Sequence, residues 1–441
     1  MITLIKNGTV VTSNQNGDVL FNTSIKIEDG IISEMTQKSH EEANAAEVVD
    51  AQGLVINPGF IQTHVHLCQT LFRGLADDLQ LLDWLCKKIF PMEAAHTADS
   101  TYLSALLGIA ELIRSGTTTI MDMGSINHEE EIIRAIVETG LRAFVGKAMM
   151  DLNDVYPPFK ESTDESLRST RKLIERWHNS FDGRIRYALA PRFVLSCSDK
   201  LMQSAFEMLK SYPGILFHTH ASENKTEAQK VYDRCKMGNV EFLNHLGLLS
   251  ERTCLAHCVH LNDNEYELLK STRTKVLHCP SSNLKLGSGI AKVPKLLEMG
   301  VNVSLAADGA PCNNNLDMFQ EMRLASLIQK PFYGADAMKA ETTFRMATIE
   351  GAKALGLDKE VGSIEVGKKG DIVLLNLNNV HNPVNDSNIY SSIVYSSRPE
   401  NVDSVMINGK WIYRKGEFTA IDIDRVLKES RDELTDLLKR V

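Results

Sequence analysis

The sequence lacks the features that mark membrane, secreted and nucleic-acid-binding proteins. None of its eight cysteines forms a C-x-x-C pair, so neither a disulfide framework nor a cysteine-based zinc finger is expected. No uninterrupted apolar run reaches the roughly 18 residues of a membrane-spanning helix, and no basic segment precedes an apolar one at the N-terminus. No cluster of Lys and Arg offsets the formal net charge of −9, which argues against nucleic acid as a partner. The sequence therefore predicts a cytoplasmic protein.

Length and hydrophobic content limit the possible architectures. The 441 residues, of which 43% are hydrophobic, suffice to bury a large core. A single barrel with a smaller appended domain fits this length as well as two equal domains do. The pattern along the chain decides between them.

Both ends of the chain contain short β-type runs separated by turn residues. Residues 1–58 contain TLIKNGTVV, SIKIEDGII and EVVDAQGLVINPG, and residues 361–420 contain GSIEVGKKGDIVLLNL and SVMINGKWIYRKGEF. The Asn-Gly and Lys-Gly steps in these runs suit tight hairpins. We therefore expect both segments to form one small β-sandwich domain. Residues 421–441 are predicted to form an amphipathic surface helix.

Between these ends, residues 59–360 alternate apolar strand-like runs with longer amphipathic stretches. This alternation predicts an α/β fold of parallel strands joined by crossover helices. The eight runs are GFIQTHVH (59–66), TTTIMDM (117–123), RAFVGKAMM (142–150), RIRYALA (184–190), GILFHTH (214–220), TCLAHC (253–258), TKVLHC (274–279) and VNVSLAAD (301–308). A helix is expected in STYLSALLGIAELIRSG, where apolar residues recur at three- and four-residue spacing before Gly116. Eight strands with intervening helices predict a (β/α)8 TIM barrel.

Side chains suited to metal binding stand at the ends of these runs. His64 and His66 close the first run, and a strand that ends in His-x-His presents both imidazoles on one face. His220, His257 and Asp308 fall at or near the ends of runs five, six and eight. Barrel active sites are assembled at the carboxyl ends of the strands, so these residues should converge on one mouth. Imidazoles and a carboxylate suit zinc, which would activate a water molecule for attack at neutral pH.

Five ordered motifs resemble those of the amidohydrolase superfamily, in the branch of purine and s-triazine deaminases and chlorohydrolases. They are HVHLCQ, HTHASE, LAHCVHL, HCPSSNLKLGSGIAKVP and ADGAPCNNNLDMFQEMRLAS. The resemblance covers nearly the whole chain and implies one divalent metal, zinc or iron, held by His64, His66, His220 and Asp308. Members with two metals bridge them with a modified lysine on strand four, but run four here reads RIRYALAPRF and contains none. The resemblance also favours a homo-oligomer, a dimer or tetramer.

The chemistry of displacing an amino group from an electron-poor ring assigns roles to the remaining groups. The reaction needs an activated water, a proton for the ring nitrogen, and a base that passes a proton to the departing ammonia. Asp308 can act both as metal ligand and as proton shuttle. Glu223, three residues after His220, would protonate the ring nitrogen, because a desolvated pocket favours its protonated form. His257 would hydrogen-bond the attacking oxygen and steady the charge that develops there.

Residues after the first strand suggest how the substrate is held. Family members that deaminate adenosine-like nucleosides use a tryptophan and a glutamate that match Trp84 and Glu93 in this sequence. A carboxylate at position 93 can accept hydrogen bonds from both ribose hydroxyls. Gln69, in the HVHLCQ motif, is a further candidate for substrate contact.

Three positions depart from this nucleoside pattern. S-adenosylhomocysteine deaminases carry a histidine where this chain has Arg192, and two arginines for which Lys147 and Lys160 are the nearest candidates here. The segments LRAFVGKAMMDLND and PRFVLSCSDKLM resemble guanine deaminases instead, and an arginine fork matches the O6 and N7 acceptors of guanine. The DGAPCNNNLDMF segment and the overall length look closer to 5′-deoxyadenosine deaminases, which also carry a PRF tripeptide.

The leading expectation is therefore a deaminase of a small aminopurine nucleoside: 5′-deoxyadenosine, 5′-methylthioadenosine or S-adenosylhomocysteine. Guanine deaminase is the second expectation, and an s-triazine amino- or chlorohydrolase is the third. A non-catalytic barrel scaffold should have lost a ligand or the acid, whereas all six key groups are present. His218 is expected to face away from His220 and pack in the barrel wall. His260 and His278 are expected to be hydrogen-bonded structural residues.

Overall fold

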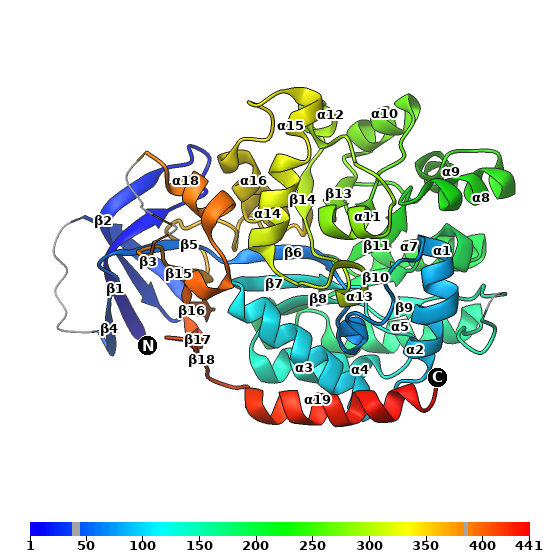
Figure 1. Cartoon of the computed structure of the whole chain (residues 1–441), viewed down its shortest axis with the longest axis horizontal. Helices are drawn as coiled ribbons and strands as arrows, with labels where there is room; N and C mark the ends of the chain where they lie inside the picture. The colour runs from blue at the N-terminus through cyan, green and yellow to red at the C-terminus, as the bar shows by residue number, and fades with distance from the viewer. Residues whose placement is uncertain (38–44, 155, 381, 383–386) are drawn as a thin grey trace.

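The computed structural model describes residues 1–37, 45–154, 156–380, 382 and 387–441. Two parts are distinct: a sheet built from both ends of the chain, and a barrel of strands surrounded by helices (Figure 1). β5 (Leu54–Pro58) of the sheet leads directly into β6 (Phe60–Val65) of the barrel. The first barrel strand therefore starts beside the sheet, and its carboxyl end points away from it (Figure 1).

Strands from the two ends of the chain interleave in one sheet. Within the described residues this sheet has nine strands in the order β18-β17-β16-β15-β5-β1-β2-β3, with β4 paired to β1. Antiparallel pairing of β5 with β15 joins the two chain ends, and Ile5, Ile25, Ile56 and Leu374 belong to the apolar core of this domain. The remaining strands are β1 (Ile2–Val11), β2 (Val19–Glu28), β3 (Ile31–Thr36), β4 (Glu47–Asp50), β15 (Ile372–Asn376), β16 (Val402–Ile407), β17 (Lys410–Arg414) and β18 (Glu417–Phe418). The predicted sandwich thus takes the form of one continuous β-rich sheet.

Each of the eight runs forms parallel strand structure in a second sheet, which confirms the predicted (β/α)8 barrel. Its strands after β6 are β7 (Thr117–Asp122), β8 (Arg142–Val145), β9 (Ala148–Met149), β10 (Ile185–Pro191), β11 (Leu216–Ala221), β12 (Thr253–His257), β13 (Lys275–His278) and β14 (Val303–Leu305). In the described residues the order is β14-β13-β12-β11-β10-β8-β7-β6, with β9, the second half of run three, paired to β10. A parallel bridge between Val65 and Asp308 and a 3.1 Å hydrogen bond from the Asp308 N–H to the His64 carbonyl close the barrel. The closure therefore fixes the backbone of two predicted metal ligands.

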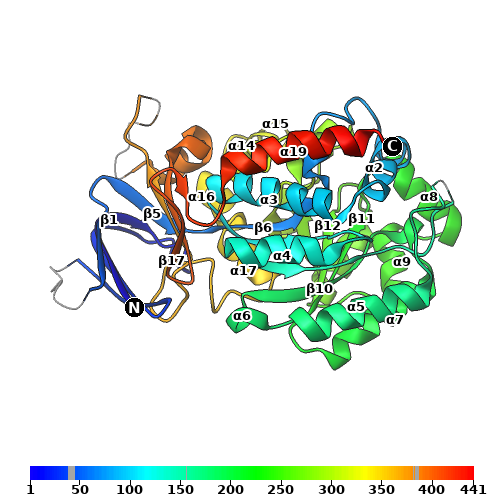
Figure 2. The ribbon, with the colours of Figure 1, turned by 90° about the horizontal axis from the view of Figure 1, so that it is seen from below.

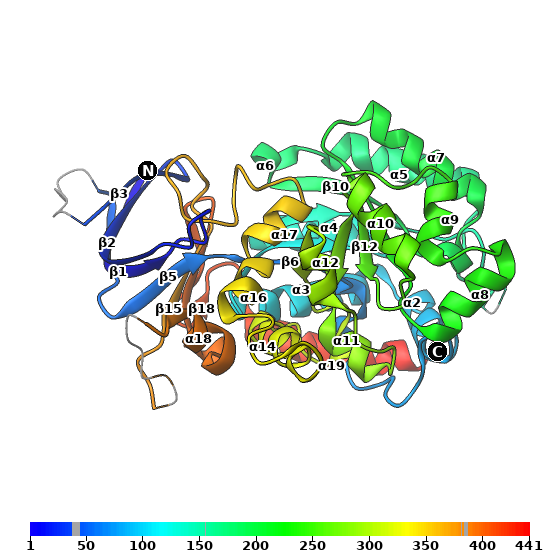
Figure 3. The same ribbon diagram turned by 90° about the horizontal axis from the view of Figure 1, so that it is seen from above.

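Helices join the strands and surround the barrel (Figure 3). α3 (Ala98–Arg114) begins at Thr97, whose hydroxyl accepts a hydrogen bond from the Ser100 N–H, and Gly116 with φ of 83° follows its end. This capped start and left-handed stop explain why the amphipathic stretch forms a helix of this length. The other helices up to β12 are α1 (Leu81–Trp84), α2 (Phe90–Ala94), α4 (Glu129–Thr139), α5 (Thr163–Trp177), α6 (Ser180–Gly183), α7 (Asp199–Ser211), α8 (Lys225–Cys235) and α9 (Asn239–His245). Those after it are α10 (Asp263–Thr272), α11 (Pro280–Lys285), α12 (Val293–Glu298), α13 (Ala310–Asn313), α14 (Met318–Leu327), α15 (Lys330–Tyr333), α16 (Ala340–Met346), α17 (Ile349–Ala354), α18 (Ile389–Ser391) and α19 (Ile423–Leu438).

The barrel interior is filled toward the amino ends of its strands. Ile61, Met121, Phe144 and Leu277 pack there in one apolar cluster with residues of α17. Active sites of such barrels are assembled at the carboxyl ends of the strands. That is the end at which the predicted metal ligands stand.

The last helix packs on the outside of the barrel, as the sequence predicts. α19 lies along α3 (Figure 2), and its buried Leu437 belongs to an apolar cluster that includes Trp84 and Phe90. None of the described helices combines the length and the apolar character needed to cross a bilayer. The division of the chain at residues 1–58, 59–360, 361–420 and 421–441 stays a prediction.

Candidate metal centre and substrate pocket

Four side chains from three strand ends meet at the mouth of the barrel. One ligand atom each of His64, His66, His220 and Asp308 lies within 4.8 Å of the others. Asp308 Oδ1 is 3.3 Å from His64 Nε2 and 3.4 Å from His66 Nε2, and His66 Nε2 is 3.3 Å from His220 Nε2. Separations of this size allow all four atoms to bind one cation at about 2.0–2.2 Å.

In two of the three histidines, the ring nitrogen that faces away from this cluster has a hydrogen-bond partner. His220 Nδ1 donates to the Arg192 carbonyl oxygen at 2.6 Å, which leaves Nε2 as the free donor atom. His64 Nδ1 lies 2.7 Å from His218 Nε2. Such contacts orient ligating imidazoles and fix their tautomers.

The expectation for His218 was wrong in its direction. His218 shares the inner face of β11 with His220, because residues two apart on a strand point the same way. It is fully buried, as expected for a residue of the core or the barrel wall, and its Nε2 lies beside His64 Nδ1. His260 makes the expected structural hydrogen bond: its Nε2 donates to the Ser288 carbonyl oxygen at 2.7 Å. His278 is buried, and neither of its ring nitrogens has a hydrogen-bond partner in the described residues.

The residues at the mouth fit a divalent metal. His64 Nε2 is buried and makes no hydrogen bond in the part of the chain that the structure describes, so an atom with a lone pair points into the cluster without a protein donor. Burial lowers the pKa of His64, His66 and His220, which keeps the imidazoles neutral as metal binding requires. Three nitrogens and one carboxylate oxygen form a donor set typical of zinc or iron.

Asp308 is held in its ionised form. Burial alone would raise the pKa of Asp308, but its contact with His64 and the field of the neighbouring imidazoles hold it well below its usual value. Its Oδ2 accepts a hydrogen bond from the Ser282 hydroxyl at 2.7 Å, and its Oδ1 accepts one from the Gly309 N–H at 2.8 Å. A carboxylate in this setting can bind a cation and accept a proton at neutral pH.

Glu223 and His257 stand beside this centre. His257 Nδ1 donates to Asn283 Oδ1 at 2.8 Å, so its Nε2 is the unprotonated atom; it lies 3.6 Å from Glu223 Oε2 and 3.8 Å from Asp308 Oδ2. Burial and the nearby charge of Asp308 raise the pKa of Glu223 well above its usual value. This setting favours the protonated form of Glu223, next to a carboxylate whose setting favours the ionised form.

Backbone with positive φ also occurs where these side chains enter the mouth. Asp308, His257 and Ser222 have φ of 65°, 73° and 52°, in the left-handed region that residues other than glycine rarely adopt. Such conformations persist where the surrounding structure imposes them, and they are common at functional sites. Here they occur directly at the carboxyl ends of β11, β12 and β14.

A cavity opens onto the cluster, with about 430 Å³ of empty space that includes its opening to solvent. The lining residues are His66, Gln69, Leu81, Trp84, Leu85, Arg192, Phe193, His220, Glu223, Glu227, His257, Leu286 and Asp308. The cavity therefore joins the metal cluster and the acid to three of the predicted substrate residues.

Three predicted substrate residues form one buried polar group. Arg192 Nη1 and Nη2 donate to the two carboxylate oxygens of Glu93 at 2.7 and 3.0 Å, and Gln69 Nε2 donates to the same carboxylate at 2.7 Å. The side chains of Glu93 and Arg192 are 0% and 4% exposed. Arg192 also lies over the ring of Phe90, 5.1 Å from its centroid. The structure thus pairs Glu93, which was predicted to bind the ribose, with Arg192, which suggested guanine as the substrate.

The other candidates differ in position. Trp84 lines the cavity, and its buried Nε1 has no hydrogen-bond partner among the residues described. Lys147 is buried, but its ammonium pairs with Glu161 and it does not line the cavity. Lys160 is exposed to solvent. The geometry thus favours Trp84 over both lysines as a substrate contact.

Sequence reasoning missed the residues that orient the centre. Ser282 and Asn283 belong to the PSSN segment of a motif that the sequence shows plainly, but no role was assigned to them. Asp122, at the end of β7, accepts hydrogen bonds from the Leu67 N–H at 2.8 Å and the Gly124 N–H at 2.9 Å, which fixes the loop after His66. Its position at a strand end, like that of the ligands, was the available signal.

Comparison with known proteins agrees with this geometry. Residues 55–412 match the Amidohydrolase family. The chain is 37% identical to a 5-methylthioadenosine/S-adenosylhomocysteine deaminase of Thermoanaerobacter pseudethanolicus over 99% of both chains. It is 42% identical to a 5′-deoxyadenosine deaminase of Methanothermobacter thermautotrophicus over 92% of both chains.

A solved structure has the same fold over the full length. An adenosine deaminase from Xanthomonas campestris with bound zinc superposes with a TM-score of 0.92 at 29% identity, covering 100% of this chain and 99% of that one. The match covers both the barrel and the β-rich sheet. Fold, motifs and extent of similarity agree, and the chain belongs to the amidohydrolase family.

Proposed function

We propose that this protein is a metal-dependent hydrolytic deaminase of an adenine nucleoside with a small or thioether 5′ substituent. The observation that carries the proposal is the pair of carboxyl groups at the mouth of the barrel. The surroundings raise the pKa of Glu223 and lower that of Asp308, and the two carboxyl groups lie 3.6 and 3.8 Å from His257 Nε2. Hydrolytic deamination needs an acid and a base in this arrangement.

Each of these residues has one task in the reaction. When bound to His64, His66, His220 and Asp308, a divalent metal supplies Lewis-acid activation of the attacking water. Asp308 accepts a proton from that water and passes it to the leaving amino group, which departs as ammonia. Glu223 donates its proton to the ring nitrogen next to the attacked carbon, which makes the ring accept the new C–O bond.

His257 positions the attacking water. Its Nδ1 is fixed on Asn283, so Nε2 can accept a hydrogen bond from the water and hold it between Glu223 and Asp308. The proton that Glu223 gives up is replaced by the second proton of the water. Atoms balance as aminopurine plus water giving oxopurine plus ammonia.

The polar group at the cavity wall supports a nucleoside as substrate. Glu93 Oε1 accepts hydrogen bonds from Arg192 Nη2 and Gln69 Nε2, whereas Oε2 accepts one from Arg192 Nη1 and keeps a lone pair. We propose that this lone pair accepts a ribose hydroxyl and that Trp84 packs against the nucleoside. The relatives that are named for 5′-deoxyadenosine and 5-methylthioadenosine support this choice.

The finer predictions belong to the same proposal. Zinc is the metal we propose, with iron as the alternative, because imidazole and carboxylate donors accept both. A dimer or tetramer in the cytoplasm is proposed from the family resemblance. Metal analysis of the purified protein and light scattering test these points directly.

A screen for ammonia release tests the function. The substrates are 5′-deoxyadenosine, 5′-methylthioadenosine, S-adenosylhomocysteine, adenosine, guanine, 8-oxoguanine and melamine, each offered to the metal-loaded protein. We expect the highest kcat/KM for 5′-deoxyadenosine or 5′-methylthioadenosine. Turnover of guanine or melamine in preference to every nucleoside would overturn the proposal.

Guanine deaminase remains the second candidate because Arg192 lines the cavity. An arginine can donate to O6 and N7 of guanine together. In this structure, however, both terminal nitrogens of Arg192 already donate to Glu93. Guanine would have to bind the remaining N–H groups of Arg192 or displace Glu93, which places this candidate below the nucleosides.

A further inference from the structure

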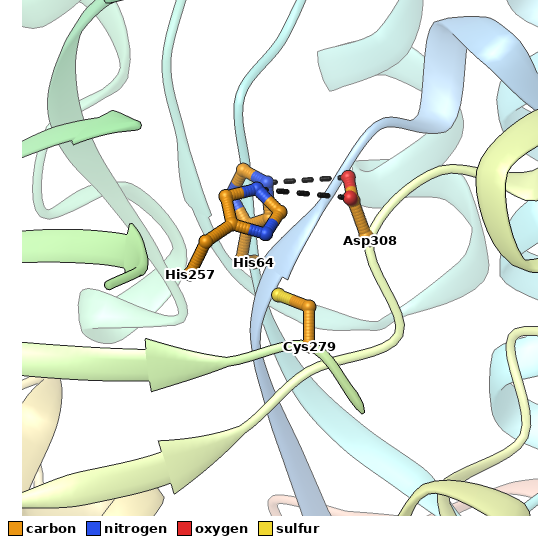
Figure 4. A group of neighbouring side chains, drawn as sticks. All are labelled: His64, His257, Cys279 and Asp308. Atoms are coloured by element: carbon orange, nitrogen blue, oxygen red, sulfur yellow. Dashed lines mark ion pairs between the residues drawn. The ribbon is translucent and has the colours of Figure 1, made fainter. Parts of the chain in front are cut away.

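A thiol borders the metal cluster, and nothing in the proposed reaction uses it. One ligand atom each of His64, His257, Cys279 and Asp308 lies within 4.8 Å of the others. Figure 4 shows Cys279 below the two imidazoles, with its sulfur turned to their side and the carboxylate of Asp308 opposite. His64 and Asp308 also belong to the first cluster, so His257 and Cys279 are the two residues found only in this second cluster.

The register of β13 places this thiol in the barrel. Leu277 belongs to the apolar layer that fills the interior, and Cys279 follows two residues later toward the mouth, on the same face. The thiol donates a hydrogen bond to the Leu277 carbonyl oxygen at 3.7 Å, and the side chain is fully buried. This hydrogen bond is long and therefore weak.

The two carboxylate oxygens of Asp308 face different histidines. Oδ1 faces His64 and His66 at 3.3 and 3.4 Å, whereas Oδ2 faces His257 Nε2 at 3.8 Å. His257 Nε2 is buried and has no hydrogen-bond partner among the described residues. The Ser282 hydroxyl also contacts Oδ2, but a carboxylate oxygen has two lone pairs and can serve a second partner.

We propose a second cation position, formed by His257 Nε2, Cys279 Sγ and Asp308 Oδ2, that takes a thiophilic divalent ion such as Zn²⁺ or Cd²⁺. Three protein ligands and one solvent molecule complete a tetrahedral site. The thiol proton leaves to solvent as the sulfur–metal bond forms. Thiolate selects soft ions, so Mg²⁺ and Ca²⁺ do not bind there.

Occupation of this position inhibits the enzyme. The ion takes the Nε2 of His257 and the second oxygen of Asp308, the atoms that position the water and move its proton. The inhibitory consequence rests on the proposed function, whereas the binding itself does not. The first equivalent of metal activates and the second inhibits, which makes the protein sensitive to an excess of zinc.

Metal titration tests the site without depending on turnover. Protein that carries one equivalent of zinc is titrated with Cd²⁺ in equilibrium dialysis, and deamination is measured in parallel. We expect a second equivalent to bind and to inhibit, and Mg²⁺ at the same concentrations to do neither. Cys279→Ser should weaken binding of the second equivalent at least about tenfold and leave turnover with one equivalent unchanged.

Cobalt provides a direct signature of the sulfur ligand. Titration of the one-equivalent protein with Co²⁺ should produce a thiolate-to-cobalt charge-transfer band in the near ultraviolet, absent in Cys279→Ser. Cys254→Ser is the matched control, because Cys254 is also buried in the barrel but lies outside the cluster. It should keep both the band and the inhibition.

Two outcomes overturn the proposal. One is a second equivalent that binds Cys279→Ser as tightly as the wild type, and the other is a wild-type titration with no charge-transfer band. If Cys279→Ser does not fold, Cys279→Ala and the wild-type comparison of Cd²⁺ with Mg²⁺ decide. A protein that binds the second ion but deaminates nothing would contradict the proposed function and leave this site standing.

Discussion

The buried ion pair between Glu93 and Arg192 predicts a large and non-additive loss of stability when either partner is replaced. The two side chains are 0% and 4% exposed, and two charge-assisted hydrogen bonds of 2.7 and 3.0 Å join them. Glu93→Gln leaves a guanidinium in the interior without a counter-ion. Arg192→Met leaves a buried carboxylate with Gln69 as its remaining donor.

The magnitude follows from desolvation. Removing one partner of a buried pair costs about 3–5 kcal/mol, whereas replacing both charges by neutral groups of similar volume is near neutral. We therefore expect each single substitution to lower the free energy of unfolding by about 3–5 kcal/mol, and the double substitution by about 1–2 kcal/mol. The coupling energy should exceed about 2 kcal/mol, which is large for a single pair.

Urea unfolding of the wild type, both single variants and the double variant gives this cycle, provided all four carry the same metal load. Arg176 and Glu130, a pair 59% and 52% exposed, serve as the control and should couple by less than about 1 kcal/mol. Effects of Glu93→Gln and Arg192→Met that add to within about 0.5 kcal/mol would refute the reasoning, because they would mean that water reaches the pair.

The remaining predictions concern the acid, the metal and a buried histidine. Glu223→Gln should lower kcat by about 10²–10⁴ and change KM little, because the proton is needed in the transition state; steady-state kinetics that show the loss in KM alone would contradict the role. A chelator should abolish turnover and lower the thermal midpoint, and one equivalent of zinc should restore both; full activity at a tenth of an equivalent would speak against the metal. Burial lowers the pKa of His96 to about 4, below the unfolded value of about 6.5. The unfolded state therefore binds more protons between these pH values, and stability is full above pH 6.5 and falls toward pH 4, by about 3 kcal/mol in all. Urea unfolding at pH 7.5 and 5.5 should show a smaller pH dependence for His96→Gln than for the wild type, and an equal dependence would disprove the assignment.

The barrel and its metal ligands could be predicted because both leave local marks in the sequence. A parallel strand buried on both faces is a short apolar run, and all eight runs could be seen without knowing their neighbours. A residue that follows such a run stands at the mouth by topology alone. This condition is met by His64, His66, His220 and Asp308. Their convergence could therefore be predicted without knowing any distance.

The polar group of Gln69, Glu93 and Arg192 could not be predicted in the same way. Its members come from three separate segments, and no periodic pattern links a glutamate of α2 to an arginine 99 positions away. The sequence offered two readings, a ribose anchor at Glu93 and a guanine-binding Arg192, as though they were alternatives. The structure shows that the two charges neutralise each other, which no local pattern reveals.

The mouth of the barrel contains two carboxylic acids in opposite states, and their environments explain why. Glu223 and Asp308 both lie near His257. Burial and the charge of Asp308 raise the pKa of Glu223 against the opposing effect of Arg192, whereas the imidazoles around Asp308 hold its pKa down. Two acids whose environments push their pKa values apart take the roles of proton donor and proton acceptor. The ionised Asp308 itself raises the pKa of Glu223. The group that takes up the proton of the water therefore also favours the protonated form of the acid that protonates the ring. The different roles of the two acids therefore follow from the three histidines that lower the pKa of Asp308.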